Sequence, residues 1–198
     1  MSVIAHEYQS KTALPFQPEE LKNLERVRGY RRVGGRLSEM QKFFASQPAG
    51  IIHFIGHGGI LAANATVNDY AIQLEDGTLN VQGWQGSTPQ NLSKHPFFFF
   101  NACHIGEAQR LVNFVNGWAP AVLERGASGY VGALWQINDH GASEFAAKFY
   151  EILDEKLKLG PISVAEVLRL TRRTFLKNGD PTFLAYVYYG DPNLTFFR

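Results

Sequence analysis

Two short apolar runs, each followed closely by glycine, constrain the fold of this chain most. Ile51 to Ile55 is followed by Gly-His-Gly-Gly, and Phe97 to Phe100 is followed by Asn-Ala-Cys-His-Ile-Gly. Runs of this length that are almost entirely apolar are typical of parallel strands that helices cover on both faces. In an open α/β sheet, ligands bind outside the carboxyl ends of such strands. The sequence therefore predicts an α/β fold with a site where these two strands end.

Segments with apolar residues at helical spacing alternate with apolar runs along the chain. We predict strands at about residues 2–5, 30–33, 51–55, 97–100, 129–135 and 184–189, and helices at about 18–28, 37–47, 106–125, 142–158 and 164–175. Pro120 is expected to kink or divide the third of these helices. Between residues 61 and 93, turn-forming residues surround short alternating pieces such as Tyr70 to Leu74, which predicts a β-hairpin excursion.

The order of these elements also predicts the architecture. Strands that alternate with helices imply right-handed crossovers and a mainly parallel sheet between two helical layers. A chain of 198 residues with 45% hydrophobic residues suits one domain with a sizeable core. We therefore expect a single three-layer α/β domain over residues 1–198, with helices on both faces of the sheet and one hairpin excursion.

Charge and composition argue against several classes of partner. The net charge is +1, and the one dense basic run, Arg26 to Arg36, also contains Tyr30 and glycines, so we interpret it as a solvated helix end and turn. No segment is apolar for long enough to span a bilayer, and the first residues do not resemble a secretory signal. The single cysteine excludes an internal disulfide, which fits a reducing compartment, so the sequence predicts a cytoplasmic protein. Together with the charge pattern and the lack of long apolar segments, it predicts no nucleic-acid or membrane partner.

Cys103 and His57 are the candidate reactive residues at the ends of the two runs. A helix that begins near Gly106 would favour a thiolate at Cys103, since its amino end carries free amides and a positive dipole. The glycines on either side of His57 would let a substrate backbone approach and leave amides free to bind an oxyanion. A thiolate with an imidazole acid or base is typical of cysteine peptidases. The alternatives are a buried, inert cysteine and a histidine that only forms a turn.

The remaining histidines and glycines do not predict a cofactor. His53 lies inside an apolar strand and is expected to be a hydrogen-bonded core residue, and we interpret His104 as structural. His53, His57, Cys103 and His104 are all possible zinc ligands by type, but four residues along a strand span about 13 Å, which is too far for one ion. The glycines around His57 match neither a dinucleotide-binding nor a P-loop pattern. We expect no metal and no other cofactor.

Four segments together resemble the CHAT domain of the caspase-like cysteine peptidases, a group that also includes caspases, metacaspases and separases. In order, they are His-Phe-Ile-Gly-His-Gly at 53–58, Phe-Asn-Ala-Cys-His-Ile-Gly at 100–106, Gly-Tyr-Val-Gly-Ala-Leu-Trp-Gln-Ile-Asn-Asp at 129–139 and Tyr-Gly-Asp-Pro at 189–192. The resemblance is clearest over residues 36–198. It implies a caspase-like fold and a catalytic dyad of His57 and Cys103.

The resemblance also implies a mechanism and a substrate class. Cys103 would attack a peptide carbonyl, His57 would protonate the leaving amine, and the amides of Gly58 and Cys103 would form the oxyanion hole. The substrate would be a protein. CHAT domains often occur in larger proteins with sensor or repeat segments, so a regulatory partner or a larger chain is also expected.

Substrate specificity depends on three further candidates. Metacaspases carry an aspartate two residues before the cysteine, where this chain has the neutral Asn101, whereas separase-like chains carry one after the Leu-Trp strand, where Asp139 stands. We expect Asn101, Trp135 and Asp139 to contact substrate, with Asp139 favouring a basic P1 residue. Asp139 could instead cap the helix that follows it. The alternative function for the whole chain is a catalytically inactive CHAT-like module that serves as a binding or signalling scaffold.

Overall fold

The structure is a computed structural model that describes residues 1–6, 8, 14–60, 70–104, 112–135 and 137–197. The strands are β1 (Ser2–Ala5), β2 (Arg31–Val33), β3 (Ile51–Ile60), β4 (Tyr70–Leu74), β5 (Gly77–Asn80), β6 (Phe97–His104), β7 (Gly129–Ala133), β8 (Ile162–Ser163), β9 (Tyr186–Gly190) and β10 (Thr195–Phe196). The helices are α1 (Gln17–Val27), α2 (Leu37–Ala45), α3 (Val81–Ser87), α4 (Val112–Glu124), α5 (Asp139–Leu157), α6 (Val164–Lys177) and α7 (Thr182–Ala185).

The main sheet is mostly parallel. Its order is β2-β1-β3-β6-β7-β9; the first five strands are parallel, and β9 runs antiparallel to β7 at one end. β4 and β5 form a hairpin whose first strand pairs with the carboxyl end of β3. The mainly parallel sheet and the hairpin excursion are both confirmed. β8 and β10, which we did not predict, form a separate two-stranded sheet.

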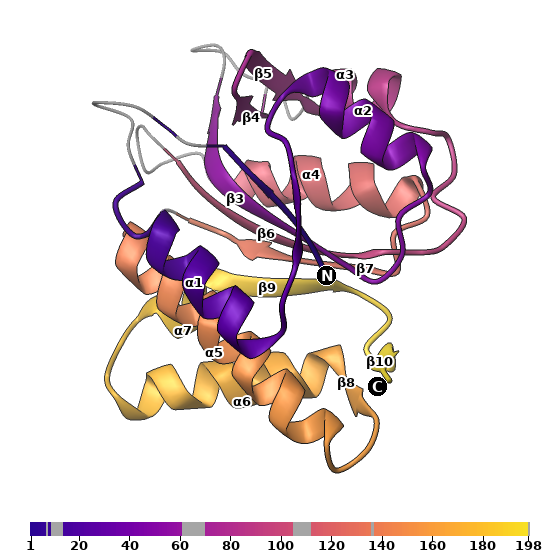
Figure 1. Cartoon of the computed structure of the whole chain (residues 1–198). Helices are drawn as coiled ribbons and strands as arrows, with labels where there is room; N and C mark the ends of the chain where they lie inside the picture. Colours follow the sequence, from indigo (N-terminus) through magenta and orange to yellow (C-terminus); the bar gives the residue numbers. More distant parts are fainter. Residues whose placement is uncertain (7, 9–13, 61–69, 105–111, 136, 198) are drawn as a thin grey trace.

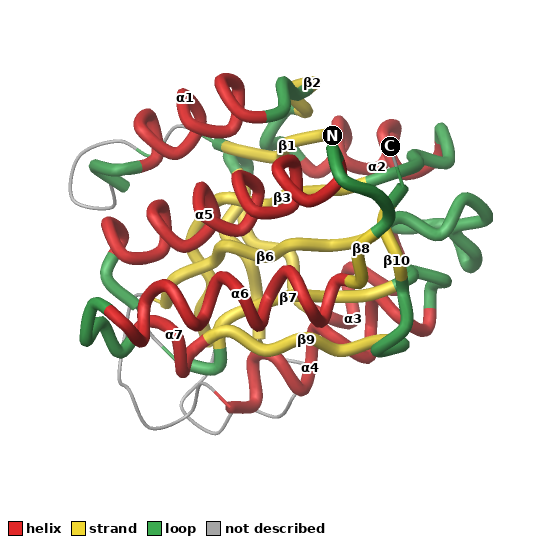
Figure 2. Tube along the Cα trace, turned by 90° about the horizontal axis from the view of Figure 1, so that it is seen from below, coloured by secondary structure: helices red, strands yellow, loops and turns green. Residues whose placement is uncertain are grey.

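Helices cover both faces of the sheet, which confirms the three-layer α/β class. α1, α5, α6 and α7 lie on one face and α2, α3 and α4 on the other (Figure 1), and Figure 2 shows α1, α5 and α6 side by side across the first face. The phenylalanine run of β6 supplies both cores, because successive side chains point to opposite faces. Phe97 and Phe99 pack with α5 and α6, whereas Phe98 and Phe100 pack with α2, α3 and α4.

Both strands that carry the candidate residues are longer than predicted. β3 continues through the glycines to Ile60, and β6 continues to His104, so His57 and Cys103 lie in strands and not in turns. The hairpin explains the extension of β3, because β4 pairs with Gly58, Gly59 and Ile60 and holds their backbone extended. Neighbouring strands therefore overrode the turn preference of the glycines.

Three further elements differ from the sequence predictions. Residues 81–87 form α3, although we expected turns and short strands throughout residues 61–93; the Asn80 side chain caps this helix by accepting a 2.7 Å hydrogen bond from the Gly83 amide. Pro120 does not divide α4, which runs through it to Glu124. The last strand begins at Tyr186, because the residues before it form α7. The expected helix start at Gly106 lies outside the described residues.

The described part of the chain contains no helix that could cross a membrane. None of its helices combines the length and the apolar composition that a transmembrane helix requires.

Candidate active site

The sheet register places the two candidate catalytic residues on neighbouring strands. His57 in β3 and Cys103 in β6 are direct Cα partners, and both lie near the carboxyl ends of parallel strands. Neighbouring strands lie about 4.8 Å apart, so the backbones of these residues are adjacent. The side chain of Cys103 lies outside the described part of the structure. What the structure brings together is therefore the His57 side chain and the backbone that carries Cys103.

Tyr8 holds His57 in place from the carboxyl end of β1. The His57 amide donates a 3.0 Å hydrogen bond to the Tyr8 hydroxyl, which in turn donates to the Gln73 carbonyl oxygen at 3.0 Å. The Tyr8 and His57 rings meet edge to face with centroids 4.4 Å apart. Burial raises the pKa of Tyr8 to about 12, so its hydroxyl keeps the proton that this chain of bonds needs at neutral pH. His57 itself is 7% exposed.

Gly56 makes room for a neighbouring side chain of the protein, whereas we expected from the sequence that it would make room for a substrate backbone. A Cβ atom at Gly56 would lie 2.4 Å from the Tyr8 hydroxyl oxygen and 2.8 Å from the Phe54 ring. The missing side chain therefore admits Tyr8 and not a substrate backbone. Gly58 is the register partner of Ile72 in β4 and of His104 in β6. The oxyanion role of the Gly58 and Cys103 amides stays a prediction.

Asp139 lies at the same edge of the sheet as His57. It is the first residue of α5, and its Oδ2 accepts a 2.7 Å hydrogen bond from the Phe16 amide just before α1. Burial raises the pKa of Asp139, while the Phe16 amide and the nearby His57 and His140 rings act in the opposite direction. Asp139 follows the carboxyl end of β7, and His57 lies near the carboxyl end of the parallel strand β3, so both residues lie at the same sheet edge.

Asp139 is not the cap of its helix. Asn138 occupies the N-cap position of α5, and its side chain accepts a 2.7 Å hydrogen bond from the Gly141 amide. The alternative explanation for Asp139, that it is present to cap the helix, is therefore wrong, because the preceding residue satisfies that requirement. Trp135 follows β7 by two residues and is 40% exposed, which leaves part of a large apolar side chain open to solvent near the carboxyl end of that strand.

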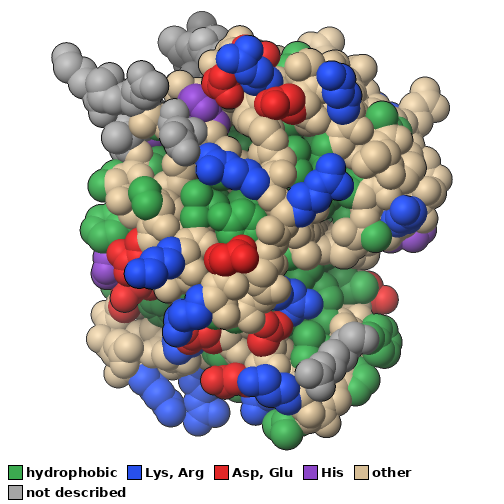
Figure 3. Space-filling model, viewed as in Figure 1, with side chains coloured by type: hydrophobic (Ala, Val, Ile, Leu, Met, Phe, Trp, Pro, Cys, Tyr) green, Lys and Arg blue, Asp and Glu red, His purple; other side chains and the backbone are tan. Residues whose placement is uncertain are grey.

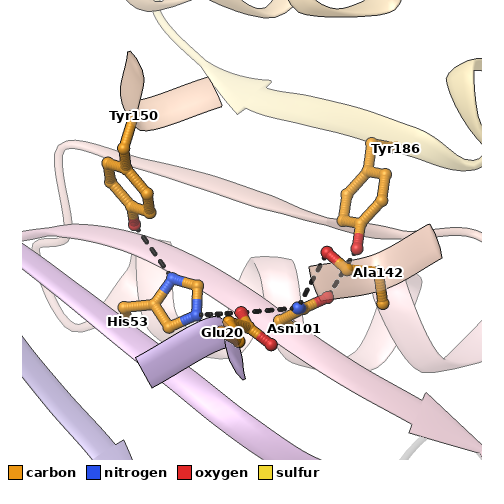
Figure 4. Close-up of polar contacts among 6 residues, drawn as sticks. All are labelled: Glu20, His53, Asn101, Ala142, Tyr150 and Tyr186. Atoms are coloured by element: carbon orange, nitrogen blue, oxygen red, sulfur yellow. Dashed lines mark hydrogen bonds and ion pairs between the residues drawn. The ribbon is translucent and has the colours of Figure 1, made fainter. Parts of the chain in front are cut away.

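Asn101 belongs to a buried polar cluster and not to an open pocket (Figure 4). Its Nδ2 donates to Glu20 Oε1 at 2.7 Å and to the Ala142 carbonyl oxygen at 3.2 Å. Its Oδ1 accepts from the Tyr186 hydroxyl. Both amide hydrogens and the carbonyl are thus used inside the protein, so we leave Asn101 out of the substrate site proposed below.

His53 is a member of the same cluster, and its prediction as a hydrogen-bonded core histidine is confirmed. It is fully buried, with Nε2 2.9 Å from Glu20 Oε1 and Nδ1 2.9 Å from the Tyr150 hydroxyl (Figure 4). Burial raises the pKa of Tyr150 well above its usual value, so its hydroxyl stays protonated. The His53 ring thus joins Tyr150 on one side and Glu20 on the other. Glu20 thereby ties α1 to both β3 and β6.

Sequence reasoning missed Tyr8 and Glu20. Tyr8 follows the first strand by three residues, which places it at the same sheet edge as His57, and this position was the only indication available. Glu20 lies in the first turn of α1 beside Glu19, where acidic residues are common because they favour the helix dipole. Its burial to 1% exposure follows from the tertiary fold alone.

The described part of the chain contains no evident metal site. Its residues include no group of three or more His, Cys, Asp or Glu side chains that could hold a metal ion. The side chains of Cys103 and His104 lie outside the described part of the structure, so the expected absence of a metal stays a prediction.

Comparison with known proteins identifies the family. The family model of the CHAT domain matches residues 4–189. This match begins closer to the amino terminus than expected and includes the end of β1, Tyr8 and α1. A search of curated proteins finds no significant match. The family model spans nearly the whole chain, including the strands that carry His57 and Cys103. The chain therefore belongs to the CHAT domain family.

Proposed function

We propose that this chain is a caspase-like cysteine endopeptidase with His57 and Cys103 as its catalytic dyad. The observation that carries the proposal is the register of β3 and β6, which makes these residues Cα partners near the carboxyl edge of the sheet. This edge is where open α/β folds place their ligands. Membership of the CHAT family, which is related to caspase-like cysteine peptidases, supports the same assignment.

The proposed reaction proceeds through an acyl-enzyme. The Cys103 sulfur attacks the scissile carbonyl carbon, and the amides of Gly58 and Cys103 stabilise the resulting oxyanion. His57 transfers a proton to the leaving amine, and water then hydrolyses the thioester. Tyr8 supports this chemistry indirectly, because its hydroxyl and ring fix the backbone and the plane of His57. No step requires a cofactor.

A peptide library separates this function from an inactive one. We expect the wild-type chain to cleave a proteome-derived peptide library at sites that share a P1 preference, and Cys103→Ala to leave the same library intact. Mass spectrometry of the products gives activity and cleavage sites in one measurement. A library that the wild-type chain leaves intact would contradict the proposal.

A catalytically inactive scaffold is the second candidate function. The observation that favours it is the burial of His57, which is 7% exposed and covered in part by the Tyr8 ring. A scaffold would bind a protein partner through this edge without cleaving it. The Cys103→Ala comparison distinguishes the two functions, because a scaffold needs no thiol.

The position of Asp139 predicts a preference for arginine at P1. Its Oδ2 already accepts one hydrogen bond, but a carboxylate has further lone pairs that a guanidinium can engage. Asp139→Asn should lower the selectivity for arginine over neutral P1 residues by about tenfold or more. The asparagine can still accept from the Phe16 amide, so the fold should persist.

The matched control for Asp139→Asn is Glu144→Gln on the exposed face of the same helix, where Glu144 pairs with His140. Selectivity is read from cleavage rates of peptides that differ only at P1. Unchanged arginine preference in Asp139→Asn, or an acidic or apolar P1 in the wild-type chain, would exclude Asp139 from the S1 pocket.

A further inference from the structure

A hollow of about 680 Å³ lies between α6 and the edge strand β9, away from the candidate active site. Its apolar lining includes Leu168, Leu176, Phe183 and Val187, and Leu176 is 55% exposed. The volume falls within the range of about 300–1,000 Å³ that is typical of ligand pockets. None of the lining residues belongs to the cluster around His57.

The hollow lies along one side of the apolar stripe of α6. This stripe, which includes Val164, Val167, Leu168 and Phe175, is buried against α5 and the sheet. Leu168 also lines the hollow at the edge of the stripe, where the partly exposed Ala165 and the exposed Leu176 extend the apolar surface toward solvent. The described residues therefore leave this apolar margin of the helix without a covering element.

Three arginines surround this apolar surface. Arg169, Arg172 and Arg173 all line the hollow, and no acidic residue does. Arg169 pairs with Glu166 on the exposed surface, and Arg172 donates through Nε to the Phe183 carbonyl oxygen at 2.8 Å. Arg173 is exposed and forms no hydrogen bond or ion pair within the described part of the chain. Lys and Arg side chains, with acidic side chains between them, lie along the lower margin of Figure 3, where α6 lies in Figure 1.

The sheet edge beside the hollow can accept another strand. Among the described strands, β9 pairs with β7 alone and forms one end of the main sheet. Val187 packs toward the core on one face and Tyr188 toward the core on the other, yet both line the hollow. An occupant would therefore lie alongside β9, where its main chain can hydrogen-bond to the strand.

From these three features we infer that the hollow docks an extended, acidic segment of a partner protein. The segment adds to β9 as a further strand, places apolar side chains on Leu168, Leu176 and Phe183, and directs carboxylates to the arginines. Arginine suits this purpose because its planar guanidinium pairs with carboxylates in bidentate geometry.

A second copy of this chain fits the same surface less well. Two copies that paired antiparallel through β9 would be related by a twofold axis perpendicular to the joined sheet. Both α6 helices would then lie on one face, with the arginines of one copy toward those of the other. The resulting like-charge repulsion favours an acidic partner over self-association.

The test uses a fluorescein-labelled peptide of about eight residues that alternates glutamate with valine or leucine, long enough to cover β9 at ~3.4 Å per residue. Fluorescence anisotropy should show binding to the wild-type chain and none when lysine replaces every glutamate. Arg169→Glu/Arg173→Glu should weaken binding by about tenfold or more. Lys42→Glu/Lys94→Glu, an equal charge change at exposed positions elsewhere, should not.

Hydrogen exchange distinguishes strand addition from simple charge attraction. The peptide should increase the protection of residues 186–190, which charge attraction alone would not change. Equal affinity of the wild-type chain and the double arginine variant, no binding at millimolar peptide, or unchanged exchange in β9 would each overturn the inference. Concentration-dependent dimerisation that the arginine substitutions strengthen, seen by sedimentation, would overturn it in favour of a second copy.

Discussion

Peptide cleavage is expected to fall to background in Cys103→Ala and by about 10²- to 10⁴-fold in His57→Ala. Cys103→Ala removes the nucleophile, without which no acyl-enzyme can form. His57→Ala removes the proton donor for the leaving amine but keeps the backbone register of β3 and β6. Initial cleavage rates of one library-derived peptide give both values, and circular dichroism confirms that each variant folds.

Two other histidines serve as controls for this prediction. His95 lies near the amino end of β6, is exposed and contacts the Gly126 carbonyl oxygen at 2.8 Å, so His95→Ala should keep wild-type activity. His53→Ala should lower stability by about 1–3 kcal/mol, because it leaves buried partners without a hydrogen bond. A His53→Ala protein that is inactive yet as stable as the wild type would show that His53, and not His57, is the catalytic histidine.

Glu20→Ala is expected to have the largest effect on folding, a loss of about 2–6 kcal/mol in the free energy of unfolding, at about 1–3 kcal/mol for each of the two buried donors left unpaired. The carboxylate is 1% exposed and accepts hydrogen bonds from His53 and Asn101 on two adjacent strands. Alanine would leave both donors unpaired in the core and release the contact of α1 with the sheet. Urea unfolding monitored by tryptophan fluorescence measures the change.

Glu19→Ala is the matched control, since Glu19 is the exposed neighbour in the same helical turn. It should change the free energy of unfolding by no more than about 0.5 kcal/mol. Glu20→Gln keeps one acceptor oxygen and should fall between the two alanine variants. If Glu20→Ala proved as stable as Glu19→Ala, the buried cluster would contribute nothing to the fold.

The sheet core was predictable because both of its faces are covered. Ile51 to Ile55 and Phe97 to Phe100 are apolar at every position apart from His53, which leaves few alternatives to buried parallel strands. The strand ends were not predictable in the same way. Glycine tolerates turn and strand conformations alike, and it was the pairing of β4 with Gly58 to Ile60 that decided between them.

Only the site residues at the ends of the predicted parallel strands could be placed from the sequence. The carboxyl ends of parallel strands meet at one edge, which places His57 and Cys103 together from their strands alone. Tyr8 and Glu20 come from the amino-terminal segment, and only the packing of that segment against β3 and α5 brings them to His57 and His53. No local pattern encodes such contacts.

Mechanism-based labelling tests the assignment of the His57/Cys103 dyad most directly, because Cys103 is the only cysteine in the chain. A set of peptidyl acyloxymethyl ketones that vary the P1 residue would react with each protein, and intact-mass spectrometry would follow the thioether product. We predict one adduct on the wild-type chain, none on Cys103→Ala, and labelling of His57→Ala slower by about 100-fold or more. Equal labelling rates for wild type and His57→Ala, or a wild-type chain that reacts with no member of the set, would contradict the account.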